Sequence, residues 1–175
     1  MRRVLVTGFE PFGGADVNPS QKLVEALASE PSEGVELDSA KPELVVCFGQ
    51  ADGRAQVEVE RFALNFDDGA DEAGETRRAE IVPGGPVAYR SSLPVDAIVE
   101  ALREEGIPAT SSRDAGGFLC NHVFYVLMRT LAERPGIRGG FVHVPLLPGQ
   151  ALDRATPTLP LETLVRAARA ILATA

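Results

Sequence analysis

The sequence has few of the residues that stabilise disulfide-bonded or metal-bound proteins. It contains two cysteines, two histidines and no tryptophan in 175 residues. Two cysteines cannot build a disulfide framework, and without a CxxC motif or a Cys/His cluster there is no pattern of a structural zinc site. Any cysteine chemistry is therefore expected to be that of a thiol.

An excess of basic charge and a long apolar run are also lacking. The 25 acidic residues outnumber the 17 basic ones and give a net charge of −8, which repels nucleic-acid phosphates and anionic lipid surfaces. The apolar run after Met1-Arg2-Arg3 breaks at Thr7-Gly8, too early for a signal peptide, and no stretch reaches the roughly 18 apolar residues of a membrane span. We expect a cytoplasmic protein without a nucleic-acid or membrane partner.

The length and the average composition, 45% apolar and 24% charged, predict one folded domain over residues 1–175. Continuous apolar runs alternate with segments of helical spacing, which is typical of an α/β protein. The predicted strands are 4–7, 44–48, 57–64 and 141–144, and the predicted helices follow Asn18-Pro19 and cover 95–102, 123–131 and 161–172. The aperiodic residues 67–79 are predicted to form a surface loop. Glycines 139 and 140 are expected to bound the strand 141–144.

In open parallel sheets, ligands bind beyond the carboxyl ends of the strands. This rule selects residues 9–18, 49–53 and the segment after His143 by position alone. The loop Gly8–Gly14 lacks both the GxGxxG spacing and the Walker lysine, so a nucleotide site is disfavoured. Its two aromatic residues, Phe9 and Phe12, could instead wall a small neutral pocket or simply plug the end of the core.

The two cysteines lie in different settings. Cys120 directly precedes a predicted helix, and at a helix N-terminus the macrodipole and free N–H groups favour a thiolate, lower the thiol pKa and can hold an oxyanion. Cys47 lies in the middle of an apolar strand and is expected to be a small buried hydrophobe.

Only His143 and His122 could supply an imidazole base to a cysteine. A lone histidine in an apolar strand, such as His143, is most often a satisfied core residue. His122 lies two residues from Cys120, and side chains two apart on a helix do not face each other. If a base is needed, His143 is the better candidate.

A carboxylate could orient that imidazole as the third member of a triad. Glu60 lies in a strand-like run, and Glu58 has the same parity and competes with it. Spacing alone favours a different arrangement, in which Glu60 lies on a solvated edge strand and pairs with Arg61.

Four sequence blocks together resemble the pyroglutamyl peptidase I family, also called the pyrrolidone carboxyl peptidases. The blocks occur in the order of the family and span most of the chain. They are Thr7–Gly14 with Asn18-Pro19-Ser20, Gly49-Gln50-Ala51 with Glu60–Asn65, Ala115-Gly116 with Phe118–Asn121, and Gly139–Pro145. The resemblance implies a cysteine exopeptidase on a three-layer α/β/α domain with an open, twisted, mixed and mostly parallel sheet.

The resemblance also implies roles for individual residues. Cys120 is the nucleophile, His143 the general base and then acid, and Glu60 the group that orients the imidazole. The pyroglutamyl pocket is expected to have walls from Phe9, Phe12 and Phe118, and hydrogen bonds to the lactam from Asn18 and the backbone at Gln50. The family needs no metal or cofactor and forms homotetramers, so we expect neither a metal nor a cofactor, and self-association.

The chain departs from the family pattern in three places. Roughly two dozen residues are lacking near Asp38-Ser39, the loop after Asp67-Asp68 is short, and Asp52 and Glu58 replace a small residue and a hydroxyl. Because part of the pocket and a core helix are hard to lose together, we expect the missing segments to be left out of the sequence rather than deleted from the protein.

The predicted function is hydrolysis of the amide bond after an N-terminal pyroglutamyl residue, through a thioester on Cys120. The alternative is a catalytically impaired module that binds pyroglutamyl or other capped peptide ends without turnover. A nucleotide-binding α/β protein is a third hypothesis, and it predicts thermal stabilisation by nucleotides.

Overall fold

The central sheet has the strand order β2-β1-β3-β10-β4-β9 in the computed structural model, which describes residues 2–30, 34–37, 41–70 and 75–175. The strands are β1 Arg2–Thr7, β2 Val35–Leu37, β3 Leu44–Gln50, β4 Val57–Glu60, β9 Ala109–Ser112 and β10 Arg138–Val144. The first three strands of the chain and β10 run parallel, β4 is antiparallel to β10, and β9 is parallel to β4. The mixed, mostly parallel sheet is therefore confirmed.

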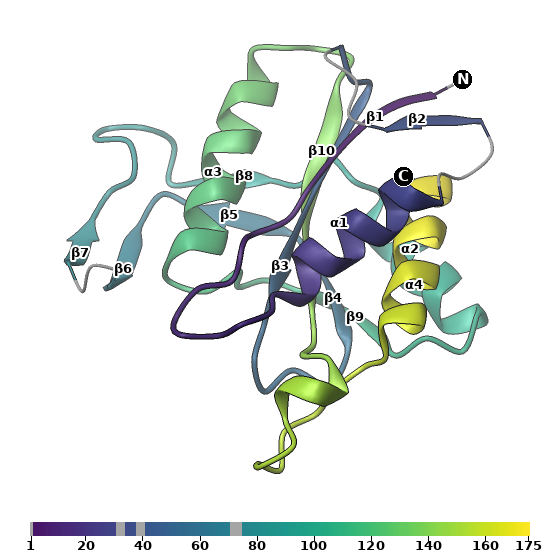
Figure 1. Cartoon of the computed structure of the whole chain (residues 1–175). Coiled ribbons are helices and arrows are strands. Elements are labelled where there is room, and N and C mark those ends of the chain that lie inside the picture. The colour runs from purple at the N-terminus through teal and green to yellow at the C-terminus, as the bar shows by residue number, and fades with distance from the viewer. Residues whose placement is uncertain (1, 31–33, 38–40, 71–74) are drawn as a thin grey trace.

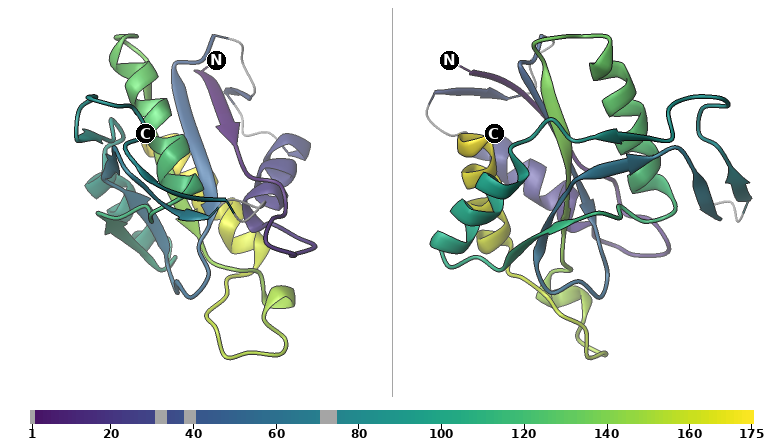
Figure 2. Two further views of the ribbon diagram at one scale, coloured as in Figure 1. Left: turned by 90° about the vertical axis from the view of Figure 1, so that its left-hand side faces the viewer. Right: turned by 180° about the vertical axis from the view of Figure 1, so that it is seen from behind.

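Helices cover both faces of this sheet (Figure 1). One face carries α1 Pro19–Ser29, α2 Val95–Glu104 and α4 Leu161–Thr174, and the other carries α3 Leu119–Ala132. Two hydrophobic clusters fill the spaces between the layers, one under the three helices and one under α3. The right-hand view in Figure 2 shows α3 separated from the three other helices by the central strands. None of the helices in the described residues is long and apolar enough to cross a bilayer.

Helix ends follow the signals in the sequence. The side chain of Asn18 accepts a hydrogen bond from the backbone N–H of Ser20 and caps α1, with proline at the first helical position. Gly106, with φ +72°, follows α2 in the left-handed conformation that glycine adopts without strain. Both signals were predicted from the sequence.

The glycine pair before Phe141 lies inside β10 rather than at its boundary. A Cβ built on Gly139 would lie 2.6 Å from Leu131 of α3 and 2.8 Å from the carbonyl oxygen of Val45. Glycine at this position therefore allows the helix and the neighbouring strand to approach the backbone of β10 closely.

The predicted strand 57–64 is two strands in two sheets. β4 ends at Glu60, and β5 Phe62–Leu64 pairs with β8 Ala88–Arg90. The chain changes sheets at Arg61, whose N–H donates to Ser112 while its carbonyl accepts from Ser91. One residue is enough for this change because its two backbone groups bond to different partners.

The prediction of a surface loop over 67–79 is wrong for the residues that the structure describes. β6 Asp67–Ala70 and β7 Thr76–Ala79 form an antiparallel pair that projects from the body of the molecule (Figure 1). An ion pair between Asp68 and Arg78, 2.9 Å, joins directly opposed residues. Cross-strand pairing of polar side chains leaves no apolar alternation, so the hairpin has no periodic signal in the sequence.

Candidate active site

The pairing register brings the chemically interesting residues onto one face of the sheet. His143 of β10 lies opposite Gly49 of β3 on one side and opposite Glu58 of β4 on the other. Side chains two residues apart on a strand point to the same face. Phe141 therefore shares the face of His143 on β10, and Glu60 shares the face of Glu58 on β4. Phe141 belongs to the cluster under α3, so the imidazole and both carboxylates lie on the α3 side.

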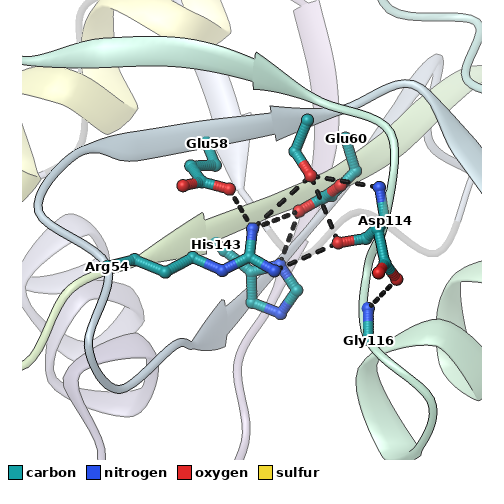
Figure 3. A network of polar contacts seen from close by, with 7 residues as sticks. Arg54, Glu58, Glu60, Asp114, Gly116 and His143 are labelled. Carbon is teal, nitrogen blue, oxygen red and sulfur yellow. Dashed lines mark hydrogen bonds and ion pairs between the residues drawn. The ribbon is translucent and has the colours of Figure 1, made fainter.

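His143 and Glu60 form a buried pair. Nδ1 of His143 lies 2.8 Å from Oε1 of Glu60, and the two residues are 4% and 0% exposed (Figure 3). When Nδ1–H donates to the carboxylate, Nε2 is left as the free acceptor of the ring. The expected solvated edge position of Glu60 is wrong, because β4 lies between β10 and β9 and Arg61 pairs with Asp96 instead.

Glu58 forms no ion pair with the imidazole among the described residues, although it lies opposite His143 in the register. Its carboxylate forms an ion pair with Arg54 from the loop before β4. The same guanidinium reaches Glu60, with Nη1 3.3 Å from Oε1 (Figure 3). Of the two competing carboxylates, Glu60 is therefore the one that binds His143.

Cys120 is the second residue of α3, and it lines one pocket together with His143. Its Sγ lies only 2.9 Å from the position that a Cβ on Gly49 would take, so the missing side chain at Gly49 leaves the space for the thiol. Burial, and after it the nearby charge of Glu60, raise the pKa of Cys120 to about 12, whereas Arg54 acts in the opposite direction. The expected lowering of this pKa at the helix N-terminus is not found.

Cys47 is buried in β3, and burial raises the pKa of its thiol. The prediction that it is a small core hydrophobe is confirmed.

The pocket beside Cys120 has a volume of about 430 Å³. Phe9 and Phe12 lie in the loop after β1, Gln50 lies at the end of β3, and Phe118 directly precedes α3. Four of the five residues expected to bind substrate therefore border the same space as Cys120 and His143. The loops at the carboxyl ends of β1 and β3 contribute to it as the parallel-sheet rule predicts.

Asn18, the fifth expected substrate-binding residue, does not line this pocket. It is 1% exposed, and its Oδ1 accepts hydrogen bonds from the N–H and the hydroxyl of Ser20 at 2.9 and 2.7 Å. Its Nδ2 donates to the carbonyl of Glu10 at 3.2 Å, and the hydroxyl oxygen of Ser20 accepts from the N–H of Phe9 at 3.0 Å. In this structure Asn18 holds the loop that carries Phe9.

His122 lies outside the pocket. Its Nδ1 is 2.9 Å from Oδ2 of Asp67, a buried carboxylate that Arg77 also contacts at 3.3 Å. His122 therefore attaches the β6–β7 hairpin to α3, as a helix-surface residue. In the parts of the chain that the structure describes, no three His, Cys, Asp or Glu residues gather closely enough to hold a metal ion.

Three residues of the site had no role in the sequence-based prediction. Gly49 leaves room for the thiol, Arg54 contacts Glu60, and Asn121 joins α3 to β5. None of the three carries a signal in the sequence, because their roles depend on which elements pack together. The spacing of four residues between Arg54 and Glu58 would pair charges on a helix, but Arg54 lies in a loop and Glu58 in a strand.

A cysteine at the start of a helix, above a histidine and a buried carboxylate on an α/β sheet, is an arrangement typical of cysteine hydrolases. The sequence profile described as "Pyroglutamyl peptidase" matches residues 2–38 and 32–175. The chain belongs to the pyroglutamyl peptidase family, a family of cysteine peptidases.

Individual relatives agree with this assignment. The chain is 45% identical to a pyrrolidone-carboxylate peptidase of Streptomyces coelicolor and 43% identical to one of Bacillus licheniformis, covering 100% and 96% of this chain and 92% and 89% of the relatives. Among solved structures, pyroglutamyl peptidase I of Bacillus amyloliquefaciens matches with a TM-score of 0.94 and 37% sequence identity, over 100% of this chain and 97% of that chain. The pyrrolidone carboxyl peptidase of Thermococcus litoralis matches with a TM-score of 0.93 and 30% sequence identity, over 99% of this chain and 93% of that chain.

The comparison also measures the shortfall near Asp38-Ser39, whose two residues lie outside the described ranges. The match to the Streptomyces relative extends over 199 positions, to which this chain contributes 175 residues. The chain therefore leaves about two dozen of the matched positions unfilled, in agreement with the shortfall expected from the sequence.

Proposed function

We propose that this protein hydrolyses the amide bond that follows an N-terminal pyroglutamyl residue of a peptide. The observation that carries the proposal is one pocket shared by Cys120, His143 and three phenylalanines, with His143 bound to the fully buried Glu60. Membership of the pyroglutamyl peptidase family supports the same substrate class.

In the proposed mechanism, Cys120 is the nucleophile. Because its thiol is protonated at neutral pH, the proton passes from Sγ to Nε2 of His143 as the sulfur–carbon bond forms. The first N–H groups of α3, which have no partners within the helix, would hold the oxyanion. Glu60 stabilises the imidazolium through Nδ1–H, as the acid of a triad does.

The tetrahedral intermediate then collapses and the carbon–nitrogen bond breaks. The imidazolium of His143 gives its proton to the leaving amine, and a thioester remains on Cys120. A water molecule that transfers a proton to His143 attacks this thioester, and pyroglutamate leaves with the free thiol restored. The cycle needs no group beyond the three side chains, the helix N–H groups and water.

The walls of the pocket account for the proposed specificity. The pyroglutamyl lactam is flat and uncharged, and Phe9, Phe12 and Phe118 offer it an apolar lining. Its N–H and C=O need hydrogen-bond partners once buried, for which we propose the backbone at Gln50, while Asn18 acts indirectly by holding the loop that carries Phe9. A free α-amine would be an unpaired charge in this pocket, so ordinary N-termini are rejected.

The test is release of a fluorophore from a pyroglutamyl amide in reducing buffer, with the matching free-amine glutaminyl amide as a control. We expect turnover of the pyroglutamyl substrate alone, and its loss in Cys120→Ala with the fold retained. Turnover by the Cys120→Ala protein would contradict the nucleophile. Binding of the pyroglutamyl amide by the unaltered protein without turnover would favour the alternative of a binding module.

We also propose a cytoplasmic location and self-association, as homotetramers by analogy with the family. A working thiol needs a reducing compartment. Sedimentation velocity of the purified protein tests the assembly, and a monomer at micromolar concentration would contradict it.

A further inference from the structure

The guanidinium of Arg54 contacts several groups around the candidate active site. Its Nη1 forms an ion pair with Glu58 and lies 3.3 Å from Oε1 of Glu60. Its Nη2 donates to the carbonyl oxygen of Asp114 at 3.0 Å (Figure 3). Arg54 itself comes from the loop between β3 and β4, so one side chain joins three segments of the chain.

Glu60 depends on these contacts. Its side chain is fully buried, and its Oε2 has no hydrogen-bond partner among the described residues. A buried carboxylate is costly unless it is paired and hydrogen-bonded. His143 carries a charge in only part of the proposed cycle, whereas an arginine is always charged. Arg54 is therefore the permanent counter-charge of Glu60 in the described structure.

The contact with Asp114 extends the network toward the nucleophile. The carboxylate of Asp114 accepts a hydrogen bond from the N–H of Gly116 at 2.9 Å. Residues 115–118 line the pocket and lead directly into Cys120. The group that binds the acid of the triad thus also holds the loop that presents the thiol.

We propose that Arg54 is a positioning residue, whose guanidinium fixes Glu60 against His143 and fixes the segment 114–118 beside the pocket. The proposal rests on the proposed peptidase function. The charge of Arg54 also favours the thiolate of Cys120, since it lowers the pKa of that thiol against burial and Glu60. Arg54 acts through these residues and has no bond-making step of its own.

Two substitutions separate the charge of Arg54 from its geometry. Arg54→Lys keeps the charge but presents a single point in place of the planar fork, and Arg54→Met removes both. Arg166→Met is the matched control, because Arg166 is 55% exposed on α4 and pairs with Glu105 away from the site. The readouts are kcat, KM, the thermal midpoint and the rate of Cys120 alkylation by iodoacetamide at pH 8.

We expect Arg54→Met to lower kcat by roughly 100-fold and Arg54→Lys by about 10-fold, with KM changing much less. Alkylation of Cys120 should slow several-fold in Arg54→Met and stay near the parent rate in Arg54→Lys. In a Glu60→Gln background, Arg54→Met should lower kcat far less than it does alone, since a residue that acts through Glu60 has less to lose there.

An unchanged kcat in a folded Arg54→Met or Arg54→Lys protein would overturn the proposal. So would an equal fold-loss of kcat from Arg54→Met in the parent and in the Glu60→Gln background. If Arg54→Met does not fold, Arg54→Lys decides in its place. A parent protein that does not turn over pyroglutamyl amides would refute the proposed function instead. The alkylation rates would then still test Arg54, and equal rates in the parent and Arg54→Met would refute its effect on the thiol.

Discussion

Cys120 is a half-buried thiol beside a negative charge, which is an unusual place for the proposed nucleophile. Burial and Glu60 raise its pKa to about 12, and Arg54 only partly opposes them. A thiol in this state is inert until a base takes its proton. The proposed mechanism therefore assigns the removal of this proton to the histidine that shares the pocket, and the free protein should hold little thiolate.

Alkylation of the free protein reports this property of Cys120. Only the thiolate reacts, and below its pKa the thiolate fraction rises tenfold for each pH unit. We expect the rate constant for iodoacetamide to climb steadily from pH 7 to pH 10 with no plateau, as measured by mass spectrometry of the peptide that contains Cys120. A plateau near neutral pH would mean that the thiol is already ionised in the resting protein. Cys47, which is buried in β3, serves as the unreactive internal control.

The thiol of Cys120 lies in the space that a side chain at position 49 would need. A Cβ at this position would lie 2.9 Å from Sγ of Cys120 and 2.7 Å from the ring of Phe141, so one of them must move. We expect Gly49→Ala to lower kcat by roughly 10-fold to 100-fold. The thermal midpoint should fall by only the few degrees that overpacking by one methyl group costs. Gly149→Ala is the control, since a Cβ there meets nothing within 4 Å; equal kcat values in the two variants would remove the role of Gly49.

At the scale of elements, Asn121 holds the start of α3 against β5. Its Oδ1 accepts from the N–H of Leu64 at 2.8 Å, and its Nδ2 donates to the carbonyls of Leu64 and Phe66 at 2.9 and 3.0 Å. The residue is 1% exposed, so its loss would leave backbone groups unsatisfied. We expect Asn121→Ala to lower the free energy of unfolding by about 3 kcal/mol.

Thermal unfolding followed by circular dichroism measures this effect. A loss of about 3 kcal/mol corresponds to a fall in the midpoint of roughly 6–12 °C for a chain of this size. Val126→Ala on the same helix, 43% exposed, should change stability by less than about 0.5 kcal/mol. If both variants unfold at the parent temperature, Asn121 does not hold these elements together.

The helices and the longer strands could be predicted from the sequence because each buries a regular face. The short elements could not: β5 and β8 have three residues each, and the β6–β7 hairpin is polar along its length. Spacing along the chain likewise could not distinguish Glu58 from Glu60, which share one face of the same strand. Their difference arises from tertiary contacts that a pattern of residue types does not contain.

At the scale of the whole molecule, a chain shorter than its relatives keeps their fold. It contributes 175 residues to a match of 199 positions, yet its TM-score to the Bacillus amyloliquefaciens enzyme is 0.94. In the described residues, β1 lies between β2 and β3, so the sheet is continuous on both sides of the shortfall. The three proposed triad residues come from β4, α3 and β10, all after that junction in the chain, so the shortfall leaves these elements intact.

Binding in the pocket should stabilise the whole molecule, because a ligand that binds only the folded state shifts the unfolding equilibrium. Cys120→Ala removes turnover but keeps the phenylalanine walls, so it allows binding to be measured alone. At a pyroglutamyl amide concentration 100 times its dissociation constant, stabilisation of about 2.7 kcal/mol should raise the thermal midpoint by roughly 5–10 °C. The glutaminyl amide should produce no shift, since its charged amine would lose its hydration in an apolar pocket. Equal shifts with both amides would show that the pocket does not select the lactam, even if the unaltered enzyme cleaves it.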